Sequence, residues 1–221
     1  MRDTHADAAP IGAATACTDA AVPHTDPKAS RTTAALAQTD AAPSRVVAAP
    51  ARVDAAPAHS DVAVRPMTPA DCRAVAALIR TAFAAQPVLT DPPPSALRET
   101  ATTVTAHLAA GGGAVACAGG KIVGSVMWEP KDGGLYLQRL AVQPAWRGRG
   151  IARALLAATE AAARRAGQPR LHLATRLVLT ANRRLFAANG FVEVALHAHP
   201  GYAAPTSVEM EKRLEPPGSA L

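Results

Sequence analysis

Residues 138–152 read Gln-Arg-Leu-Ala-Val-Gln-Pro-Ala-Trp-Arg-Gly-Arg-Gly-Ile-Ala. A short apolar run ends at Val142, Pro144 interrupts it, and a glycine-rich turn then leads into an apolar pattern of helical period. Such a turn directs unpaired backbone N–H groups and the positive end of a helix dipole at one point. These groups favour a bound phosphate, and Gly148 and Gly150 let phosphate oxygens approach the backbone. The stretch therefore predicts a strand, a phosphate-binding turn and a helix.

The first 60 residues differ in composition from the rest of the chain. They contain 20 Ala and 6 Pro, no Phe, Tyr or Trp, and three copies of Asp-Ala-Ala-Pro. A segment so poor in large apolar side chains cannot bury enough surface to offset its ordering entropy. We therefore expect a disordered Ala/Pro-rich tail over 1–60 and one folded domain over 61–221, which is long enough for a single core.

Charge divides at the same boundary. Residues 1–60 carry 5 basic and 6 acidic side chains, a net charge of −1, whereas 61–221 carry 18 and 11, a net charge of +7. A basic domain suits an anionic ligand or a nucleic acid, and composition alone does not choose between them. Because Arg-Gly-Arg-Gly occurs once, inside a periodic fold, a nucleic-acid partner is not expected.

Other composition features concern the compartment. The sequence has no run of about 18 apolar residues, so no membrane-spanning helix is expected. Asp3 and Asp7 and the lack of an apolar N-terminal segment argue against a secretory signal. Cys17, Cys72 and Cys117 have no metal-like spacing. We expect a reduced, cytoplasmic protein without a metal site or membrane partner, and leave self-association as a homodimer open.

Hydrophobic periodicity predicts a mixed α/β domain. Thr68 and Pro69 are typical of a helix start, and apolar residues then recur at helical spacing up to Phe83. Gly119-Gly120 indicates a hairpin between two strands. The further helices are expected over 97–110, from Gly150 to Arg165 and over 181–188. The strands are expected over 61–67, 113–118, 121–128, 135–142, 171–175, 191–197 and 206–213.

Several signals occur in one order over residues 62–214. The strand over 135–142 leads into Arg147-Gly148-Arg149-Gly150-Ile151-Ala152, a further strand follows, and then come Asn182 and the pair Gly190-Phe191. This order resembles the GNAT superfamily of acyl-CoA-dependent N-acetyltransferases, whose signature Arg/Gln-x-x-Gly-x-Gly/Ala matches Arg147, Gly150 and Ala152. The resemblance implies the GNAT fold, a mixed central sheet of about seven strands with flanking helices. It also implies an N-acetyltransferase that uses acetyl-CoA as co-substrate.

The resemblance further implies how the donor binds. The backbone amides of residues 147–152 would hold the CoA pyrophosphate, and the backbone at Leu140 and Val142 would pair with the pantetheine arm as an added strand does. Asn182 matches a family Asn near the pantetheine. A backbone N–H of the strand at 139–142 would stabilise the oxyanion formed from the acetyl carbonyl. The donor-binding residues so implied are Leu140, Ala141, Val142, Arg147, Gly148, Arg149, Gly150, Ile151, Ala152, Asn182 and Phe186.

One position departs from the family pattern. Members with a catalytic Tyr carry it four residues after the Asn that Asn182 matches, and this chain has Phe186 there. A phenyl ring packs but cannot protonate a departing thiolate, and a positioned general acid typically contributes about 10²–10⁴-fold. A thiol of pKa about 8.5 is already a fair leaving group, so transfer by direct attack of the amine remains the expectation. The alternative that Phe186 favours is a non-catalytic acyl-CoA-binding or regulatory module.

The general base is left open. An amine such as that of Lys, with a pKa of about 10.4, must lose a proton before it attacks. Glu129, on the strand before 135–142, and His172, on the strand over 171–175, are the nearest candidates, and a water chain to bulk serves equally well. Because His172 alternates with two leucines, a structural histidine is the competing interpretation.

The acceptor is expected to be a primary amine of a small molecule, an amino acid or a peptide. In this fold the variable segments, here about 84–112 and 197–206, build the acceptor pocket. Neither carries an interpretable motif, although the loop with His197, His199 and Tyr202 is a candidate for substrate contact. Only Asp91 and Glu99 are acidic nearby, which is too little to indicate a polycationic substrate.

Overall fold

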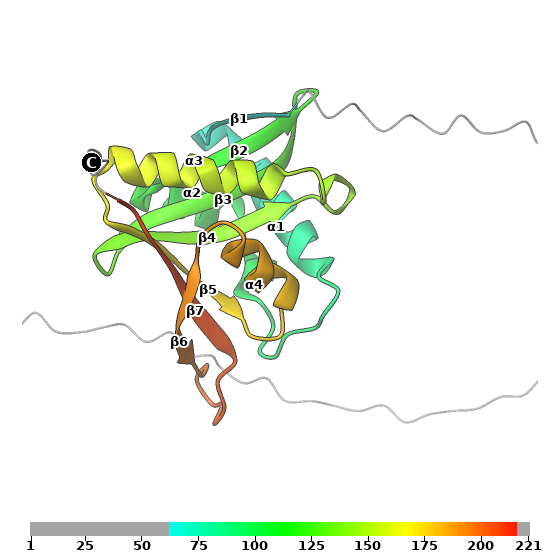
Figure 1. The fold of residues 1–221 in the computed structure, drawn as a ribbon. Helices are drawn as coiled ribbons and strands as arrows, with labels where there is room; N and C mark the ends of the chain where they lie inside the picture. Colours follow the sequence, from blue (N-terminus) through cyan, green and yellow to red (C-terminus); the bar gives the residue numbers. More distant parts are fainter. Residues whose placement is uncertain (1–61, 216–221) are drawn as a thin grey trace, which may run out of the picture. The chain divides into compact units, whose positions relative to one another are not determined.

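Alternating burial along the chain marks the strands of one seven-stranded mixed sheet, because successive side chains of a strand point to opposite faces. The computed structural model describes residues 62–215, and the tail expected over 1–60 lies outside this range. The order of strands across the sheet is β1-β2-β3-β4-β5-β7-β6 (Figure 1). The strands are Val62–Pro66 (β1), Gly112–Ala118 (β2), Lys121–Lys131 (β3), Gly134–Val142 (β4), Arg170–Arg176 (β5), Val192–His197 (β6) and Ser207–Arg213 (β7).

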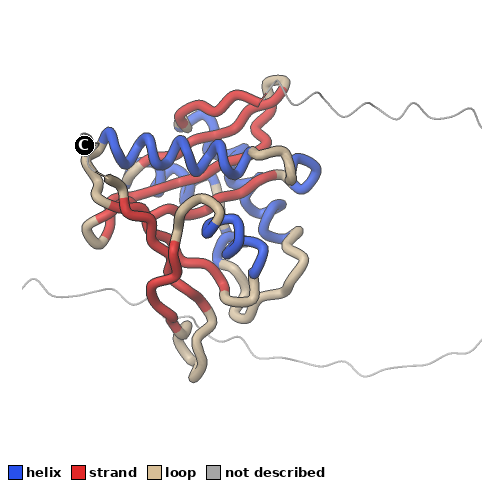
Figure 2. The backbone as a smooth tube through the Cα atoms, in the orientation of Figure 1, coloured by secondary structure: helices blue, strands red, loops and turns tan. Residues whose placement is uncertain are grey.

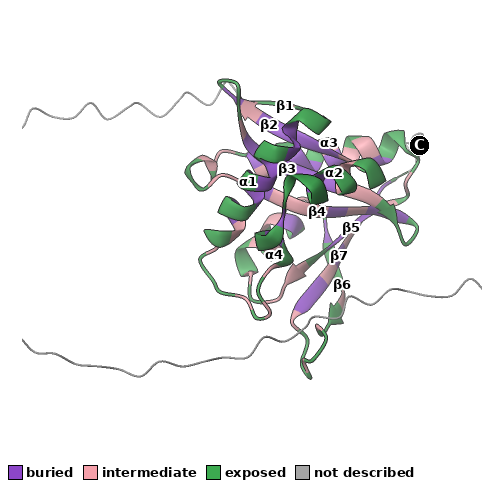
Figure 3. Ribbon diagram, turned by 180° about the vertical axis from the view of Figure 1, so that it is seen from behind, coloured by how far each residue is buried: buried purple, intermediate pink, exposed green. Residues whose placement is uncertain are grey.

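Helices cover both faces of the sheet. Helices α3 (Ile151–Arg165) and α4 (Thr180–Ala187) lie on the face seen in Figure 1. Helices α1 (Cys72–Ala84) and α2 (Ala101–Ala110) lie on the opposite face, which Figure 3 shows. Loops join these elements at the sheet ends (Figure 2). The mixed α/β fold expected from the sequence is confirmed.

The core consists of two layers, one on each side of the sheet. On the α3 side, Leu137 and Leu173 pack beneath Leu155 of the helix, and all three are almost fully buried. On the α1 side, Val75 and Ile79 of that helix cover the strands. Because strand β3 contributes to both layers, its middle residues are buried on both faces (Figure 3).

The sheet divides between β4 and β5. These two parallel strands pair only at Leu135 with Leu171 and at Tyr136 with His172. Beyond these pairs they diverge, and β5, β7 and β6 turn away from the first four strands (Figure 1). The last six residues of β4 therefore have no strand partner on that side.

A β-bulge changes the direction of side chains in β4. On β3, Ser125 and Met127 are two positions apart, but their partners on β4, Ala141 and Gln138, are three positions apart. The bulged segment of β4 contains Arg139, which has a positive φ of 54° although it is not glycine. As a result Gln138 and Arg139 both make contacts on the α2 side of the sheet.

The start of α2 differs from the sequence expectation. Residues Ser95–Arg98 form a separate 3-10 turn, after which Glu99 has extended backbone with ψ of 135°. The α-helix begins at Ala101, because Thr100 acts as its N-cap and accepts a hydrogen bond from the Thr103 N–H at 3.2 Å. The helix expected over 97–110 is therefore shorter at its start.

Helix α3 begins directly against the sheet. A Cβ atom built on Gly124 of β3 would lie 2.8 Å from Cγ2 of Ile151 and 3.1 Å from Cδ1 of Leu155. Only glycine permits this close approach, since both of these neighbours are core side chains. The contact fixes the first turn of α3 beside the outer half of β4.

The entry to α1 is held by a charged hydrogen-bond network. Both oxygens of Asp71 accept bonds from the Arg65 guanidinium, at 2.7 and 2.8 Å, and one also accepts from the Thr68 N–H and hydroxyl. The bonds from Arg65, aided by those from Thr68, outweigh burial and hold the pKa of Asp71 well below its usual range. The ionised carboxylate thus stabilises the folded state.

We predict that Asp71→Asn lowers the unfolding free energy at pH 7 by about 1–3 kcal/mol, because it removes hydrogen bonds to a charged group. The folded-state pKa of Asp71 is depressed, so its stabilisation is present above the unfolded pKa of 3.8 and is lost as pH falls below it. Urea unfolding from pH 6 to pH 2 should show a steeper loss for the parent protein. Equal pH dependence of the two proteins would contradict this assignment.

Candidate functional site

The outer half of β4 offers backbone groups to a ligand. The Gln143 N–H donates to the Val123 carbonyl at 2.9 Å, so this amide points toward β3. Because amides alternate sides along a strand, those of Leu140 and Val142 point the other way, into the gap where β5 has diverged. The structure thus leaves open the strand edge for which the sequence predicted pairing with pantetheine.

The turn before α3 leaves helix amides open. Gly148 and Gly150 both have φ of 76°, which L-amino acids rarely adopt. Gly150 is the N-cap, its carbonyl accepts the first helical bond from the Ala154 N–H at 3.0 Å, and no side chain caps the helix. The first turn also contains no acidic residue. The N-terminus therefore keeps its positive end for an external anion.

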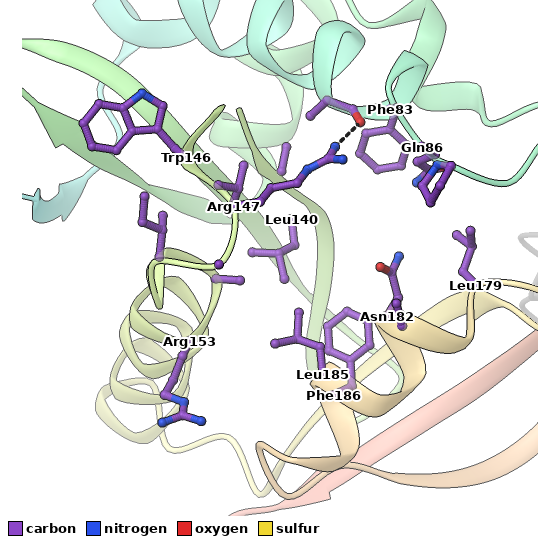
Figure 4. A pocket seen from close by; sticks show the side chains of 18 of the residues that line it. Phe83, Gln86, Leu140, Trp146, Arg147, Arg153, Leu179, Asn182, Leu185 and Phe186 are labelled. Atoms are coloured by element: carbon purple, nitrogen blue, oxygen red, sulfur yellow. Dashed lines mark hydrogen bonds between the residues drawn. The ribbon is translucent and has the colours of Figure 1, made fainter. Parts of the chain in front are cut away.

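The two arginines of this turn are held in different ways. The Arg147 guanidinium donates to the carbonyls of Ala82 at 2.8 Å and Ala85 at 3.0 Å, at the end of α1 (Figure 4). The Arg149 guanidinium lies 4.7 Å from the centre of the Trp146 ring, in cation–π contact. The Arg147 side chain thus fastens the turn to α1, and its backbone amide donates to the Pro144 carbonyl at 3.3 Å, so its phosphate contact stays a prediction.

A cavity of about 720 Å³ runs from this turn along β4. It is bounded by the end of α1, the open part of β4, the first turn of α3 and helix α4 (Figure 4). Its lining includes the cations Arg147 and Arg153 and no Asp or Glu. Nothing lies within 4 Å of a Cβ built on Gly148 or Gly150, so the space above the turn is free. Such a cavity suits an extended polyanion.

A second cavity, of about 260 Å³, lies between the diverging strands. It is lined by β4 from Tyr136 to Leu140, by β5 from Leu173 to Arg176, by Pro94–Ala96 and by His199 of the β6–β7 loop. The two cavities share six lining residues and therefore meet. These are Phe83, Gln86, Leu140, Leu179, Asn182 and Phe186.

Phe186 and Asn182 stand at this junction. They extend from α4 toward Leu140 of β4 (Figure 4). The Phe186 side chain is buried and packs edge-to-face on Phe191, with ring centres 5.8 Å apart. Phe186 therefore contributes both to the core and to the wall where the cavities meet. Its ring has no proton to give to a group at the junction.

The two candidate bases lie beside Tyr136, which lines the second cavity, but do not line it themselves. Glu129 pairs with Tyr136 across β3 and β4, and neither Glu129 nor His172 is among the residues that line the cavities. His172 is buried, with its Nε2–H donating to the Lys131 carbonyl at 3.0 Å and its Nδ1 3.4 Å from the Glu209 carboxylate. The ring also packs against Tyr136. The structural interpretation of His172 thus has direct support, and both base assignments stay predictions.

The bulge in β4 is fixed by a buried ion pair. The Arg139 Nε donates to the Glu99 carboxylate at 2.6 Å, and the Thr103 hydroxyl donates to the other oxygen at 2.5 Å. Burial opposes ionisation of Glu99, but the bonds from Thr103 and Arg139 outweigh it, so its pKa lies below the ordinary value. The pair connects the start of α2 to the strand that bears Leu140.

Several lining residues were not anticipated from the sequence. Phe83 and Gln86 come from the end of α1, and Arg153 from the first turn of α3. The helical pattern predicts only that Phe83 lies on the apolar face of its helix, and gives no signal that it lines a cavity. For Arg153 a signal was present, since it follows the turn by one residue and lies on the first helical turn.

Residues 62–215 contain no group of three His, Cys, Asp or Glu side chains arranged to hold a metal ion. In the same range no helix is long and apolar enough to cross a membrane. Cys72 and Cys117 are free thiols. The metal-free site and the compartment stay predictions.

An uncapped helix start beside an open strand edge, in the gap of a divided sheet, suits an extended phosphorylated ligand. The model of the Acetyltransferase (GNAT) family matches residues 77–191 of this chain. The chain therefore belongs to the GNAT acetyltransferase family, as the sequence resemblance implied.

Solved structures of low sequence identity have the same fold. The yncA protein of Salmonella typhimurium, solved with its cofactor acetyl-CoA, is 20% identical with a TM-score of 0.57, covering 71% of this chain and 95% of that one. The ribosomal-protein-S18-alanine N-acetyltransferase of Escherichia coli is 18% identical with a TM-score of 0.57, covering 72% and 98%. The paia N-acetyltransferase of Thermoplasma acidophilum, in complex with coenzyme A, is 16% identical with a TM-score of 0.55, covering 69% and 99%. Comparison with curated proteins gives no match.

We predict that Gly150→Ala weakens coenzyme A binding about 5- to 30-fold, because a left-handed alanine costs about 1–2 kcal/mol and is relieved by a shift of the open amides. Calorimetric titration with coenzyme A measures the dissociation constant. The matched control is Gly167→Ala, which strains a glycine of φ 64° at the other end of α3. If both variants bind coenzyme A alike, the turn does not hold the phosphates.

Proposed function

We propose that this protein is an N-acetyltransferase that transfers an acetyl group from acetyl-CoA to a primary amine by direct attack. The observation that carries the proposal is the continuity of the two cavities at Leu140, Asn182 and Phe186. One cavity begins at an anion-binding helix start and the other ends among polar side chains. Two different molecules can thus bring their reacting ends to one point.

The residues present suit acetyl-CoA, which supplies an acyl thioester when bound. Open amides from Gly148 to Ala152 would receive the pyrophosphate, and Arg153 adds positive charge beside them. The edge of β4 at Leu140 and Val142 would hold the pantetheine arm. Asn182 offers an amide at the junction. The cradle is free of side chains because both glycines lack a Cβ.

The reaction needs little from the protein beyond positioning and proton removal. The acceptor ammonium loses a proton, its nitrogen forms a bond to the acyl carbon and then releases a second proton to water, and the C–S bond breaks to release the CoA thiolate. The thiolate then takes a proton from water. A backbone N–H of β4 near Leu140 would stabilise the negative charge that develops on the acyl oxygen. Of the described residues, Ser95 and Ser207 line the second cavity, but the Ser95 hydroxyl accepts from the Arg139 guanidinium at 3.1 Å and the Ser207 hydroxyl donates to the His197 carbonyl at 3.1 Å. Neither hydroxyl is hydrogen-bonded to a general base, which supports direct attack over a covalent intermediate.

The route by which the acceptor loses its proton is the least supported step. Glu129 and His172 remain candidates only if water connects them to the second cavity, because neither lines it. A water chain that leads out of that cavity requires no such connection. Cytoplasmic location, a homodimer and the acceptor class of small molecules, amino acids or peptides also remain expectations from the sequence.

A non-catalytic acyl-CoA-binding module is the second candidate function. Phe186 favours it, because the position of the usual acidic Tyr is occupied by a ring without a hydroxyl. The second cavity argues for catalysis, since a module that only binds acyl-CoA has no need of an acceptor space that opens onto the thioester.

Binding and turnover separate these functions. We predict that acetyl-CoA and coenzyme A both bind with dissociation constants in the micromolar range, about −8 kcal/mol, measured by calorimetry. Thiol release with a panel of amines then distinguishes an enzyme from a module. Absence of binding at millimolar concentration of either ligand would overturn both functions. Binding of acetyl-CoA without thiol release for any amine would support the non-catalytic module and contradict the enzyme.

We predict that Phe186→Tyr raises kcat by up to about 10²-fold, the lower end of what a positioned general acid contributes. The reason is that a hydroxyl at the junction can protonate the departing thiolate. The dissociation constant of acetyl-CoA should not change. Phe191→Tyr is the matched control, since Phe191 packs on Phe186 but lines neither cavity. An unchanged kcat in Phe186→Tyr would mean that proton delivery to the thiolate does not limit turnover.

A further inference from the structure

The charged side chains of the second cavity are all basic. Its lining contains Arg139, Arg176 and His199, and no Asp or Glu. A cavity that binds a polyamine or an aminoglycoside would carry carboxylates, because the ammonium groups of a buried or half-buried ligand need a negative partner. This cavity instead carries basic side chains. What it can bind depends on whether a carboxylate of the protein already pairs with each of them.

Arg139 is neutralised within the protein. Its Nε donates to the buried Glu99 carboxylate at 2.6 Å, and its Nη2 donates to the Ser95 hydroxyl at 3.1 Å. The Glu99 charge is held in turn by Thr103. Arg139 is therefore a component of the bulge and leaves no net positive charge for a substrate.

Arg176 is not neutralised in this way. Its Nη2 donates to the Pro92 carbonyl at 2.7 Å and its Nη1 to Nδ1 of His199 at 3.0 Å, both neutral acceptors. Within residues 62–215 no carboxylate forms an ion pair with it. The side chain is partly buried, and a guanidinium has five N–H donors, so donors remain for a ligand.

The nearest carboxylates are engaged with other groups. Asp91 accepts a hydrogen bond from the Tyr202 hydroxyl at 2.5 Å, and acts on Arg176 only through its field. Glu209, on the neighbouring strand, lies 3.1 Å from His197 and 3.4 Å from His172. His199 beside Arg176 has its pKa lowered by burial and by the Arg176 charge, which favours the neutral ring that can accept from the guanidinium.

We propose that the acceptor of this enzyme is a small amine that carries a carboxylate, of the amino-acid class, and that Arg176 binds the carboxylate. This inference rests on the proposed acetyltransferase function. The guanidinium fork of arginine matches a carboxylate in bidentate geometry, and a cavity of about 260 Å³ has room for a molecule of few atoms.

The position of Arg176 relates this binding to the reaction. Arg176 ends β5, whereas Asn182 and Phe186, which line the same cavity, stand where the donor cavity joins it. A carboxylate held at Arg176 leaves the amine of the same small molecule directed along the cavity toward Leu140. Arg176 is thus a specificity-determining residue that binds the acceptor and does not take part in proton transfer.

The substrate test uses matched acceptors that differ only in the carboxylate. Each of a set of L-amino acids is compared with its carboxamide and with the amine that lacks the carboxyl group, with acetyl-CoA consumption as the readout. The expected result is that kcat/KM for the best amino acid exceeds that of its carboxamide by about 10- to 100-fold, as for loss of a charged hydrogen-bonded pair.

Variants assign this preference to Arg176. We predict that Arg176→Gln lowers kcat/KM for the amino acid about 10- to 100-fold and leaves that for the carboxamide within threefold. Arg176→Lys should retain part of the preference, and Arg176→Glu should reverse it toward the amine without the carboxyl group. The control is Arg213→Gln, since the Arg213 side chain is 92% exposed on β7 and lines neither cavity.

The outcomes are distinguishable from failure of the proposed function. If carboxamides or carboxyl-free amines are acetylated as well as amino acids, the enzyme stands and the role of Arg176 is overturned. Equal losses for both acceptors in Arg176→Gln mean that the side chain only fastens the Pro92 loop, which also overturns it. If acetyl-CoA binds but no amine of any class releases thiol, the proposed function fails and this inference with it.

Discussion

The separation of β4 from β5 after two paired residues is the constraint on which the site depends. A parallel sheet normally satisfies every amide of a central strand, and an unpaired buried amide costs about 1–3 kcal/mol. Here the open edge of β4 faces a cavity, where a ligand or water can take the place of a strand. On the α3 side, one core cluster joins Leu137 of the first half of the sheet to Leu173 and Met210 of the second half, so that the gap is a fixed feature of the fold.

The bulge at Arg139 adjusts this open edge. A non-glycine residue in left-handed conformation costs about 1–2 kcal/mol, and here the side chain of the same residue forms the buried pair with Glu99. The pair thus offsets the strain that the bulge requires and connects it to α2. Without the extra residue, the amides beyond position 139 would face the opposite way, and Leu140 would not present its N–H to the junction.

The order and type of elements followed from local patterns, because alternation and helical period record which face is buried. The glycine turn was also recognisable from local sequence, because Gly148 and Gly150 stand at positions whose positive φ favours glycine. The bulge was not predictable, because arginine gives no signal for a positive φ. Arg176 and the partners of Glu99 and Asp91 were equally hidden, since they depend on segments far apart in sequence that meet in the cavity. Glu129 and His172 stay predictions, because neither lines a cavity, although Tyr136, the strand partner of both, lines the second one.

Helix α3 has no N-cap side chain and no acidic residue in its first turn, although Ile151, Leu155 and Leu156 place it in the centre of the core. A phosphate group of the proposed acyl-CoA ligand would supply the missing cap. Ligand at 100 times its dissociation constant stabilises a folded protein by about 2.7 kcal/mol through mass action. Under the proposed function, bound acetyl-CoA would therefore stabilise the fold of the enzyme as well as supply the acetyl group.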